Sequence, residues 1–338
     1  MKKKVKKLIA YSIPLVVLLI FGELVMHTYD YFTSTNLYRF TLVEDDKLGW
    51  RTKANFRDEY KNGNGVLVQY QTGKNGFKTY GALTEKQRVL ILGDSFTQSV
   101  EVSNDDTYYA HLASAFDYDF FVYGMSGYGT LQEKMILEEN LAAIQPDLLI
   151  LQFCSNDFID NHFELNQACN YKINSTRPYQ TLTNKIVYAN PFPLKEQIFS
   201  KLYFTDFINS KLNNIISKMN PTESGEGKIA RLKQEYLPFK HSIAITKNLL
   251  KTIKDSLPQQ SKMLVFCSDG YEPQLATIRT ICNELDIEYL EDPIHQLRKS
   301  KTEGENPYAK DGVHWNELGH GIVGKAVAKK MVEMLSPP

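Results

Sequence analysis

A serine, an aspartate and a histidine in this sequence lie in surroundings that suit nucleophilic catalysis. Ser95 falls in Gly93-Asp-Ser-Phe-Thr97, directly after an apolar run, and Asp311 stands three residues before His314 near the C-terminus. A carboxylate at that spacing can fix the tautomer of the imidazole and stabilise the imidazolium that forms when the histidine accepts a proton from a serine. A helix cap at Ser95 and a solvated loop at 311–314 are the alternative interpretations.

Two further segments carry groups that can stabilise a developing negative charge. Tyr123-Gly-Met-Ser-Gly-Tyr-Gly129 follows another apolar run, and its glycines let a backbone N–H approach a ligand without an intervening side chain. Cys154-Ser-Asn-Asp157 follows a third apolar run and places Asn156 where its side-chain amide can point at an oxyanion. Taken singly, each segment is equally consistent with an ordinary turn.

Asp292 and His295 repeat the spacing of Asp311 and His314. This second pair is the weaker candidate, because a proline follows its aspartate and it lacks the Asn-x-x-Gly that comes after His314. A metal site on Asp311, His314 and His320 is a further alternative, but no other ligand converges on it with suitable spacing. We therefore expect neither a metal nor another cofactor.

The sequence also predicts a sheet that would position these residues. Short apolar runs alternate with amphipathic helical segments. The predicted strands are 88–93, 120–123, 147–153, 263–266 and 287–290, and the predicted helices are 107–116, 131–144, 241–257, 273–285 and 317–335. This alternation indicates an α/β protein, a three-layer α/β/α sandwich with a five-stranded parallel sheet. Functional residues in such sheets gather at the carboxyl ends of the strands.

Together these segments resemble the sequence blocks of the SGNH/GDSL hydrolase family, in the family's order. The matching residues are Gly-Asp-Ser at 93–95, the glycine of Ser126-Gly127, Ser-Asn-Asp at 155–157 and Asp-x-x-His at 311–314. The lead-in 46–87 is similar to that of membrane-anchored bacterial members. Two departures are Cys154 in place of the third block's usual glycine and Phe96 in place of the first block's leucine.

The resemblance implies a flavodoxin-like SGNH hydrolase fold and a role for each residue. Ser95 would be the nucleophile, His314 the general base and then acid, and Asp311 its orienting partner. The oxyanion hole would consist of the backbone N–H groups of Ser95 and Gly127 and the side chain of Asn156. The reaction class would be acyl transfer from an ester through an acyl-enzyme, with water or a sugar hydroxyl as the second acceptor.

The N-terminus predicts a membrane anchor. Residues 1–7 hold five lysines, and the almost wholly apolar residues 8–26 would span ~28 Å as a helix, close to the ~30 Å hydrocarbon core. Lysines before the span place the 1–7 tail in the cytoplasm and the catalytic domain outside it, in a single-pass topology. A cleaved signal peptide, which would need an A-x-A-like site that is missing here, and a buried core helix are the alternatives.

The rest of the chain divides into a linker with a small β-rich lead-in at 27–87 and a hydrolase domain at 88–338. An insertion at 158–240 interrupts that domain and holds a predicted amphipathic helix at 196–219, which would pack on the core, cover the site or lie on a membrane. The 39 basic and 39 acidic residues balance, which argues against a nucleic-acid partner. Four cysteines at 154, 169, 267 and 282 are equally consistent with disulfides and with buried thiols.

These observations predict a serine esterase that hydrolyses short-chain, mainly acetyl, esters, with small esters or acylated envelope glycans as substrates. The insertion is polar and rich in tyrosine and asparagine rather than in long apolar runs, which favours a short acyl group and a sugar. A polysaccharide O-acyltransferase with the same triad is one alternative. A catalytically silent carbohydrate-binding or assembly module on the same fold is another, and the intact set of Ser95, Asp311 and His314 argues against it.

Overall fold

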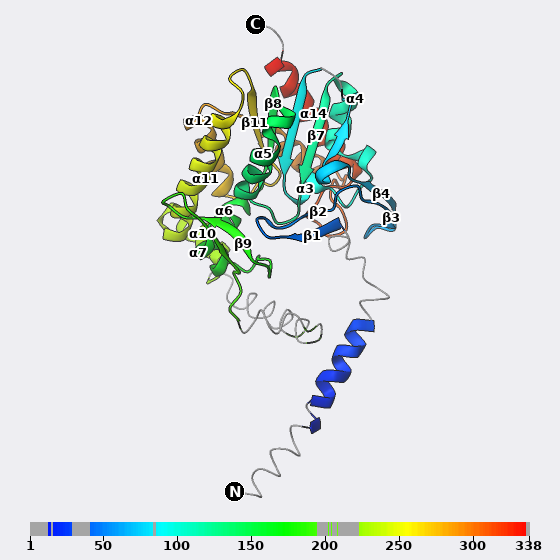
Figure 1. Cartoon of the computed structure of the whole chain (residues 1–338), viewed down its shortest axis with the longest axis vertical. Helices are drawn as coiled ribbons and strands as arrows, with labels where there is room; N and C mark the ends of the chain where they lie inside the picture. Colours follow the sequence, from blue (N-terminus) through cyan, green and yellow to red (C-terminus); the bar gives the residue numbers. More distant parts are fainter. Residues whose placement is uncertain are drawn as a thin grey trace, which may run out of the picture.

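The computed structural model describes residues 13–14, 16–28, 41–83, 86–194, 202, 204, 208 and 223–335. A six-stranded sheet lies between two layers of helices (Figure 1), in the order β12-β11-β8-β6-β7-β5. Its strands are β5 (Lys78–Tyr80), β6 (Arg88–Gly93), β7 (Asp119–Gly124), β8 (Leu148–Phe153), β11 (Lys262–Cys267) and β12 (Glu288–Leu290). The five predicted strands are all present and mutually parallel, which confirms the α/β class.

The prediction of a five-stranded, wholly parallel sheet is wrong at one edge. The short strand β5 pairs antiparallel with β7, so that the sheet is mixed. The strand has only three residues, Lys-Thr-Tyr, and no apolar β-branched residue, which is why its sequence did not predict it. Its pairing covers the free edge of β7, where unpaired backbone groups would otherwise remain.

Alternate residues of the central strands face opposite helix layers, as a strand's two-residue period requires. On β6, Leu90 and Leu92 pack with one layer, whereas Val89 and Ile91 pack with the other. The first layer comprises α5 (Thr130–Ile144), α11 (Leu237–Ser256) and α12 (Gln274–Glu284); the second comprises α4 (Tyr108–Ala115), α13 (Asp292–Thr302) and α14 (Glu317–Leu335). These two cores confirm the three-layer sandwich.

The strand order places the candidate site. The parallel strands lie side by side in the order β7, β6, β8, β11 and β12. Numbered by their place in the chain, this is the order 2-1-3-4-5 of a flavodoxin-like sheet. The order reverses between β6 and β8. Ser95 begins α3 (Ser95–Gln98) directly after β6, and Asn156 precedes α6 (Asp157–Asp160) after β8. Both residues therefore lie at the switch point, where such sheets bind ligands.

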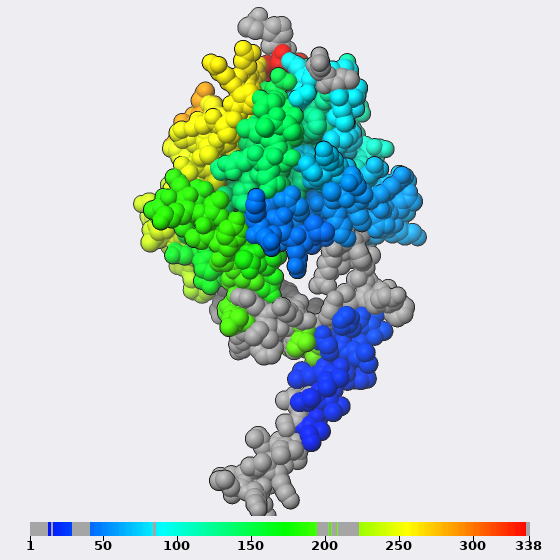
Figure 2. All heavy atoms as spheres, viewed as in Figure 1, coloured from blue at the N-terminus to red at the C-terminus, as the bar shows by residue number. Residues whose placement is uncertain are grey.

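The lead-in forms two antiparallel hairpins before β5. The first joins β1 (Leu42–Asp45) to β2 (Gly49–Thr52), and the second joins β3 (Arg57–Lys61) to β4 (Leu67–Gln71). A 3-10 turn at Lys74–Gly76 (η1) follows. Figure 2 shows the lead-in, in blue, beside the insertion, in green, on one face of the molecule.

The described part of the insertion contains short elements. They are α7 (Phe163–Ala168), β9 (Arg177–Gln180), β10 (Ile186–Ala189), α10 (Gly225–Leu232) and a 3-10 turn at Lys233–Glu235 (η3). The strands β9 and β10 pair antiparallel. The helix predicted at 196–219 falls outside the described residues, apart from residues 202, 204 and 208.

At the N-terminus, residues 16–28 are helical. Residues 8–12 and 15 of the predicted anchor lie outside the described residues. Within the part of the chain that the structure describes, no helix combines the length and the apolar character needed to cross a membrane.

The four cysteines, which left two possibilities open in the sequence, are all buried free thiols.

Candidate active site

A chain of hydrogen bonds joins the three predicted catalytic side chains. Ser95 Oγ lies 2.8 Å from Nε2 of His314, and Nδ1 of His314 lies 2.5 Å from Oδ2 of Asp311. The other carboxylate oxygen, Oδ1, accepts the backbone N–H of Val313 at 2.9 Å and that of His314 at 3.0 Å. The imidazole is thereby fixed with one nitrogen toward the carboxylate and the other toward the hydroxyl, the geometry that a serine nucleophile and its base require.

The electrostatics of the site suit a general base. Burial raises the pKa of Asp311, but hydrogen bonds from the His314 side chain and from backbone N–H groups outweigh it and hold the pKa at about 2. Burial lowers the pKa of His314, yet the hydrogen bond and charge of Asp311, with the nearby carboxylates of Asp94 and Glu101, raise it above its ordinary value overall. Asp311 therefore stays ionised at neutral pH and stabilises the imidazolium.

The loop that carries His314 is anchored directly behind it. The side-chain amide of Asn316 donates to the carbonyl oxygens of Asn306 at 2.7 Å and Tyr308 at 3.1 Å, and its oxygen accepts the N–H of Gly319 at 3.0 Å. Asn316 thus caps α14.

Phe96, which replaces the leucine of the family's first block, packs against the catalytic imidazole. Its ring centroid lies 5.0 Å from that of His314 and 4.7 Å from that of Trp315. A tilted aromatic contact of this kind restricts the orientation of the imidazole and excludes water from one side of it. The larger side chain is therefore accommodated as part of the wall of the site.

Asn156 is tied to a buried ion pair. Its side-chain amide donates to Oδ2 of Asp160 at 2.9 Å, while Oδ1 of Asp160 accepts from Nη1 of Arg177 at 2.7 Å and from the amide of Asn166 at 2.8 Å. The side chains of Asp160 and Arg177 are wholly buried. An amide nitrogen carries two hydrogens, so that Asn156 keeps one for an acceptor in the partly exposed space beside it.

Gly127 adopts a conformation that only glycine takes without strain. Its φ is +74°, and a Cβ at this position would lie 2.0 Å from Cδ1 of Ile173. The preceding residue, Ser126, is fixed from two sides, because its carbonyl accepts from Nε1 of Trp50 at 2.9 Å and its N–H donates to Oε1 of Gln98 at 3.0 Å. These contacts hold the loop in one conformation, so it is more constrained than an ordinary turn.

The lead-in and the insertion both reach the site. From the lead-in, the Asn62 side chain donates to the carbonyl of Glu101 at 2.8 Å, and a Cβ on Gly63 would lie 3.1 Å from Cβ of Lys310, the residue before Asp311. From the insertion, Ile173 covers Gly127. Beside Ser95 and His314 lies a hollow that is too narrow to admit a water molecule. Its lining includes Ser95, Phe96, Glu101, His314 and Trp315.

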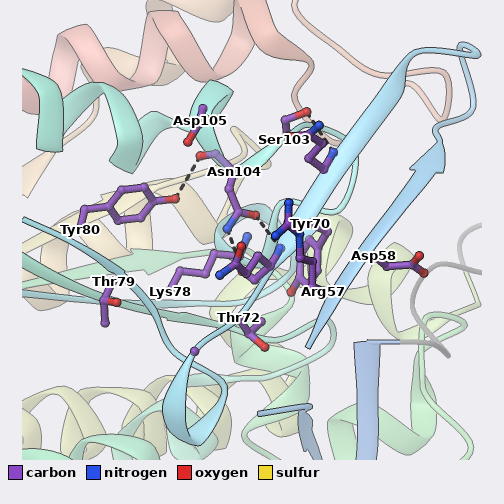
Figure 3. Close-up of a pocket in the computed structure, with 13 residues that line it drawn as sticks. Arg57, Asp58, Tyr70, Thr72, Lys78, Thr79, Tyr80, Ser103, Asn104 and Asp105 are labelled. Carbon is purple, nitrogen blue, oxygen red and sulfur yellow. Dashed lines mark hydrogen bonds between the residues drawn. The ribbon is translucent and has the colours of Figure 1, made fainter. Parts of the chain in front are cut away.

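A larger cavity of about 330 Å³ lies on the lead-in and not at the triad (Figure 3). Tyr70, Lys78 and Asn104 are among the residues that line it. Burial lowers the pKa of Lys78 to about 7. Its ammonium group donates to the carbonyl of Gln98 at 2.8 Å and to the hydroxyl of Tyr109 at 2.7 Å. These contacts are internal to the protein, and the one to Gln98 holds the last residue of α3, the helix that begins at Ser95.

The second Asp-x-x-His pair does not join Ser95. Asp292 and His295 lie in the first turn of α13, a helix that the sequence analysis missed. The carboxylate of Asp292 accepts from Gln296 at 2.5 Å, and Nε2 of His295 lies 3.5 Å from the carboxylate of Glu291. Both side chains are thus paired along their own helix.

His320 is also separate from any metal set with Asp311 and His314. Its Nδ1 accepts the N–H of Tyr108 at 3.2 Å, and burial, with the charge of Lys78, lowers its pKa to about 3. Among the described residues, these three side chains do not form a group able to hold an ion. His320 is a neutral core histidine.

Asp160, Arg177 and Trp50 were not singled out from the sequence. Asp160 follows Asn156 by four residues, which is the spacing of neighbours on a helix and could have been noticed. Arg177 and Trp50 lie in the insertion and the lead-in, respectively, and no local pattern connects either of them to the site.

One family of known proteins matches most of this chain. The model of the family described as GDSL-like lipase/acylhydrolase matches residues 89–327. No curated protein matches the sequence. Similar solved structures include a catalytic mutant of Axe2, an acetylxylan esterase from Geobacillus stearothermophilus. Its sequence is 12% identical, the match covers 75% of this chain and 95% of that chain, and the TM-score is 0.41. A Bacteroides fragilis protein assigned as an acylhydrolase is 14% identical, with a match that covers 76% of this chain and 91% of that chain and a TM-score of 0.38.

The family match spans well over half of the chain and includes the segments that carry Ser95, Gly127, Asn156, Asp311 and His314. The chain therefore belongs to the GDSL-like lipase/acylhydrolase family, and it is a serine ester hydrolase.

Proposed function

We propose that the protein removes short acyl groups, acetyl above all, from glycans of the cell envelope through an acyl-enzyme on Ser95. The observation that carries the proposal is the hydrogen-bonded chain from Ser95 through His314 to Asp311. Neutral His314 would take the proton of the Ser95 hydroxyl as Oγ attacks the ester carbonyl. The imidazolium would then give that proton to the leaving sugar hydroxyl, and water would release the acyl group in a second, equivalent round.

The negative charge on the carbonyl oxygen would be held by the predicted oxyanion hole. Ser95 is the first residue of α3, so its backbone N–H has no partner within the helix. Gly127 would contribute its backbone N–H from the constrained loop that follows β7, and Asn156 keeps one amide hydrogen. Donors fixed in advance cost no reorganisation when the charge develops.

The polar character of the insertion supports a short acyl group, because a long acyl chain would need an apolar channel. The hollow beside Ser95 and His314 is too narrow to admit a water molecule, so it offers no such channel. The location at the cell envelope is a proposal that rests on the N-terminal sequence alone, with its five lysines before the apolar residues 8–26.

The test is acetate release by the full chain in detergent, from an aryl acetate and from an acetylated oligosaccharide, with and without an unacetylated glycan. Activity that is lost in Ser95→Ala and kept in His295→Ala supports the proposal. Acetyl transfer to the added glycan in preference to water would establish the acyltransferase alternative. A folded wild-type protein that releases no acetate from either ester would contradict esterase activity and favour the silent module.

A further inference from the structure

We propose that His162, Glu164 and His241 bind a divalent transition-metal ion, with Zn²⁺ as the best fit. The ion would hold the two ends of the insertion together. One potential ligand atom from each residue lies within 4.8 Å of the other two. The inference does not depend on the catalytic proposal, because none of these residues belongs to the triad or to the oxyanion loop.

The three residues come from two segments far apart in the sequence. His162 precedes α7 and Glu164 lies in its first turn, whereas His241 lies near the start of α11. The insertion at 158–240 begins just before His162 and ends just before His241. The two imidazole rings meet edge to face, with centroids 5.8 Å apart and planes at 82°. An ion between them would therefore close the insertion at its base.

His162 has a free nitrogen in a buried position. The residue is only 8% exposed, and Nδ1 of its ring has no hydrogen-bond partner among the described residues. A buried polar atom without a partner costs free energy, and most buried nitrogens in proteins have one. A metal ion would satisfy this nitrogen.

The donor set fits the chemistry of zinc. Two imidazoles and one carboxylate are the protein ligands of several zinc enzymes, and a water molecule completes the tetrahedron. With bond lengths of about 2.1 Å, ligand atoms of tetrahedral zinc lie roughly 3.4 Å apart, so the ion would draw these groups closer. Glu164 is exposed and His241 is partly exposed, which leaves both side chains free to move toward buried His162.

We expect the bound ion to raise the stability of the folded protein rather than to change its catalytic activity. Any ligand that binds only the folded state raises the stability of that state. Imidazole ligands favour zinc over magnesium or calcium, which prefer oxygen. The ion should therefore raise the melting temperature of the protein, and magnesium should not.

The test is isothermal titration of the full chain in detergent, after treatment with EDTA and dialysis, with Zn²⁺ and separately with Mg²⁺. We expect one Zn²⁺ per chain, no heat from Mg²⁺ binding and a rise in the melting temperature with zinc. Glu164→Gln and His241→Ala should each weaken the affinity by more than the roughly 10–100-fold that loss of an outer-shell partner costs. Both positions are accessible to solvent, so these variants should remain folded.

Two controls separate this site from other histidines. His295→Ala removes an exposed histidine that has its own glutamate partner, Glu291, and should bind zinc like the wild type. His314→Ala removes the catalytic imidazole and should also keep the site. The proposal is overturned if wild-type protein binds no zinc at 100-fold molar excess, if Glu164→Gln and His241→Ala bind it unchanged, or if His314→Ala alone abolishes binding.

Discussion

The side-chain amide of Asn156 donates to the carboxylate of Asp160 at 2.9 Å, and that carboxylate is itself paired with the wholly buried guanidinium of Arg177. The partly exposed amide of Asn156 is thus held in one orientation by the buried carboxylate of Asp160, whose own position is fixed by Arg177. Burial still raises the pKa of Asp160 overall, against the opposing effect of Arg177. The insertion therefore contributes to the site by orienting the predicted oxyanion donor, and not only by covering it.

Asn156→Ala should lower kcat by about 10²–10³ while KM changes little, because the donor acts on a charge that exists only in the transition state. Asn166→Ala is the matched control. Asn166 donates to the other oxygen of the same Asp160 carboxylate at 2.8 Å but is fully buried away from solvent. Steady-state kinetics on an acetyl ester would compare them. An equal loss in both variants would mean that Asn156 acts through structure alone.

Ser95→Ala should leave a folded protein whose ester hydrolysis is reduced by roughly 10³-fold or more, and His314→Ala should be similarly severe. The two residues act as one unit through their 2.8 Å contact, so the double variant should be little worse than either single one. His295→Ala should have a mild effect, since that histidine pairs with Glu291 on α13. A crippling effect of His295→Ala would show that the wrong histidine was chosen.

The pH dependence of kcat/KM should report His314. The imidazole must be neutral to accept a proton from Ser95, and its pKa is raised above the ordinary value. Activity should therefore fall as the pH drops through that raised pKa. Asp311→Asn removes the partner charge, so the acid limb should move to lower pH while kcat falls by about 10⁴-fold, the scale known for this change in a serine triad.

A smaller shift of the same sign is expected for Glu101→Gln, because the Glu101 carboxylate also raises the pKa of His314. This variant should retain most of its kcat. An acid limb that stays in place in both Asp311→Asn and Glu101→Gln would show that another group controls the pH profile.

The sequence predicted the fold and the triad because both depend on strong local signals. The three central parallel strands β6, β8 and β11 are largely apolar runs, and Ser95, Asp311 and His314 lie in short motifs of fixed spacing. Other features come from contacts between distant segments, which no local pattern reports. The edge strand β5 depends on the free side of β7, the ion pair joins Asp160 to Arg177, and the proposed metal ligands His162 and His241 meet only in the folded chain.

The full-length chain should fractionate with membranes and resist release by high salt, because residues 8–26 are predicted to lie in hydrocarbon rather than on a charged surface. The catalytic domain should be cut by protease added from outside the cytoplasmic membrane. Detergent extraction serves as the control for aggregation. Recovery of a mature form that begins after residue 26 would identify the segment as a cleaved signal peptide.

The hydrolase should prefer acetyl esters to octanoyl esters in kcat/KM. The hollow beside Ser95 and His314 has no room even for a water molecule, so it offers no channel for a longer acyl chain, and the insertion is polar rather than apolar. A site that fully buried each added methylene would gain about 0.8 kcal/mol for it, so a lipase-like pocket should show rates that rise along the series. Measurements on acetyl, butanoyl, hexanoyl and octanoyl esters of one alcohol give the slope directly. Rates that climb steadily from acetyl to octanoyl would contradict the proposed glycan deacetylase and indicate a lipid substrate.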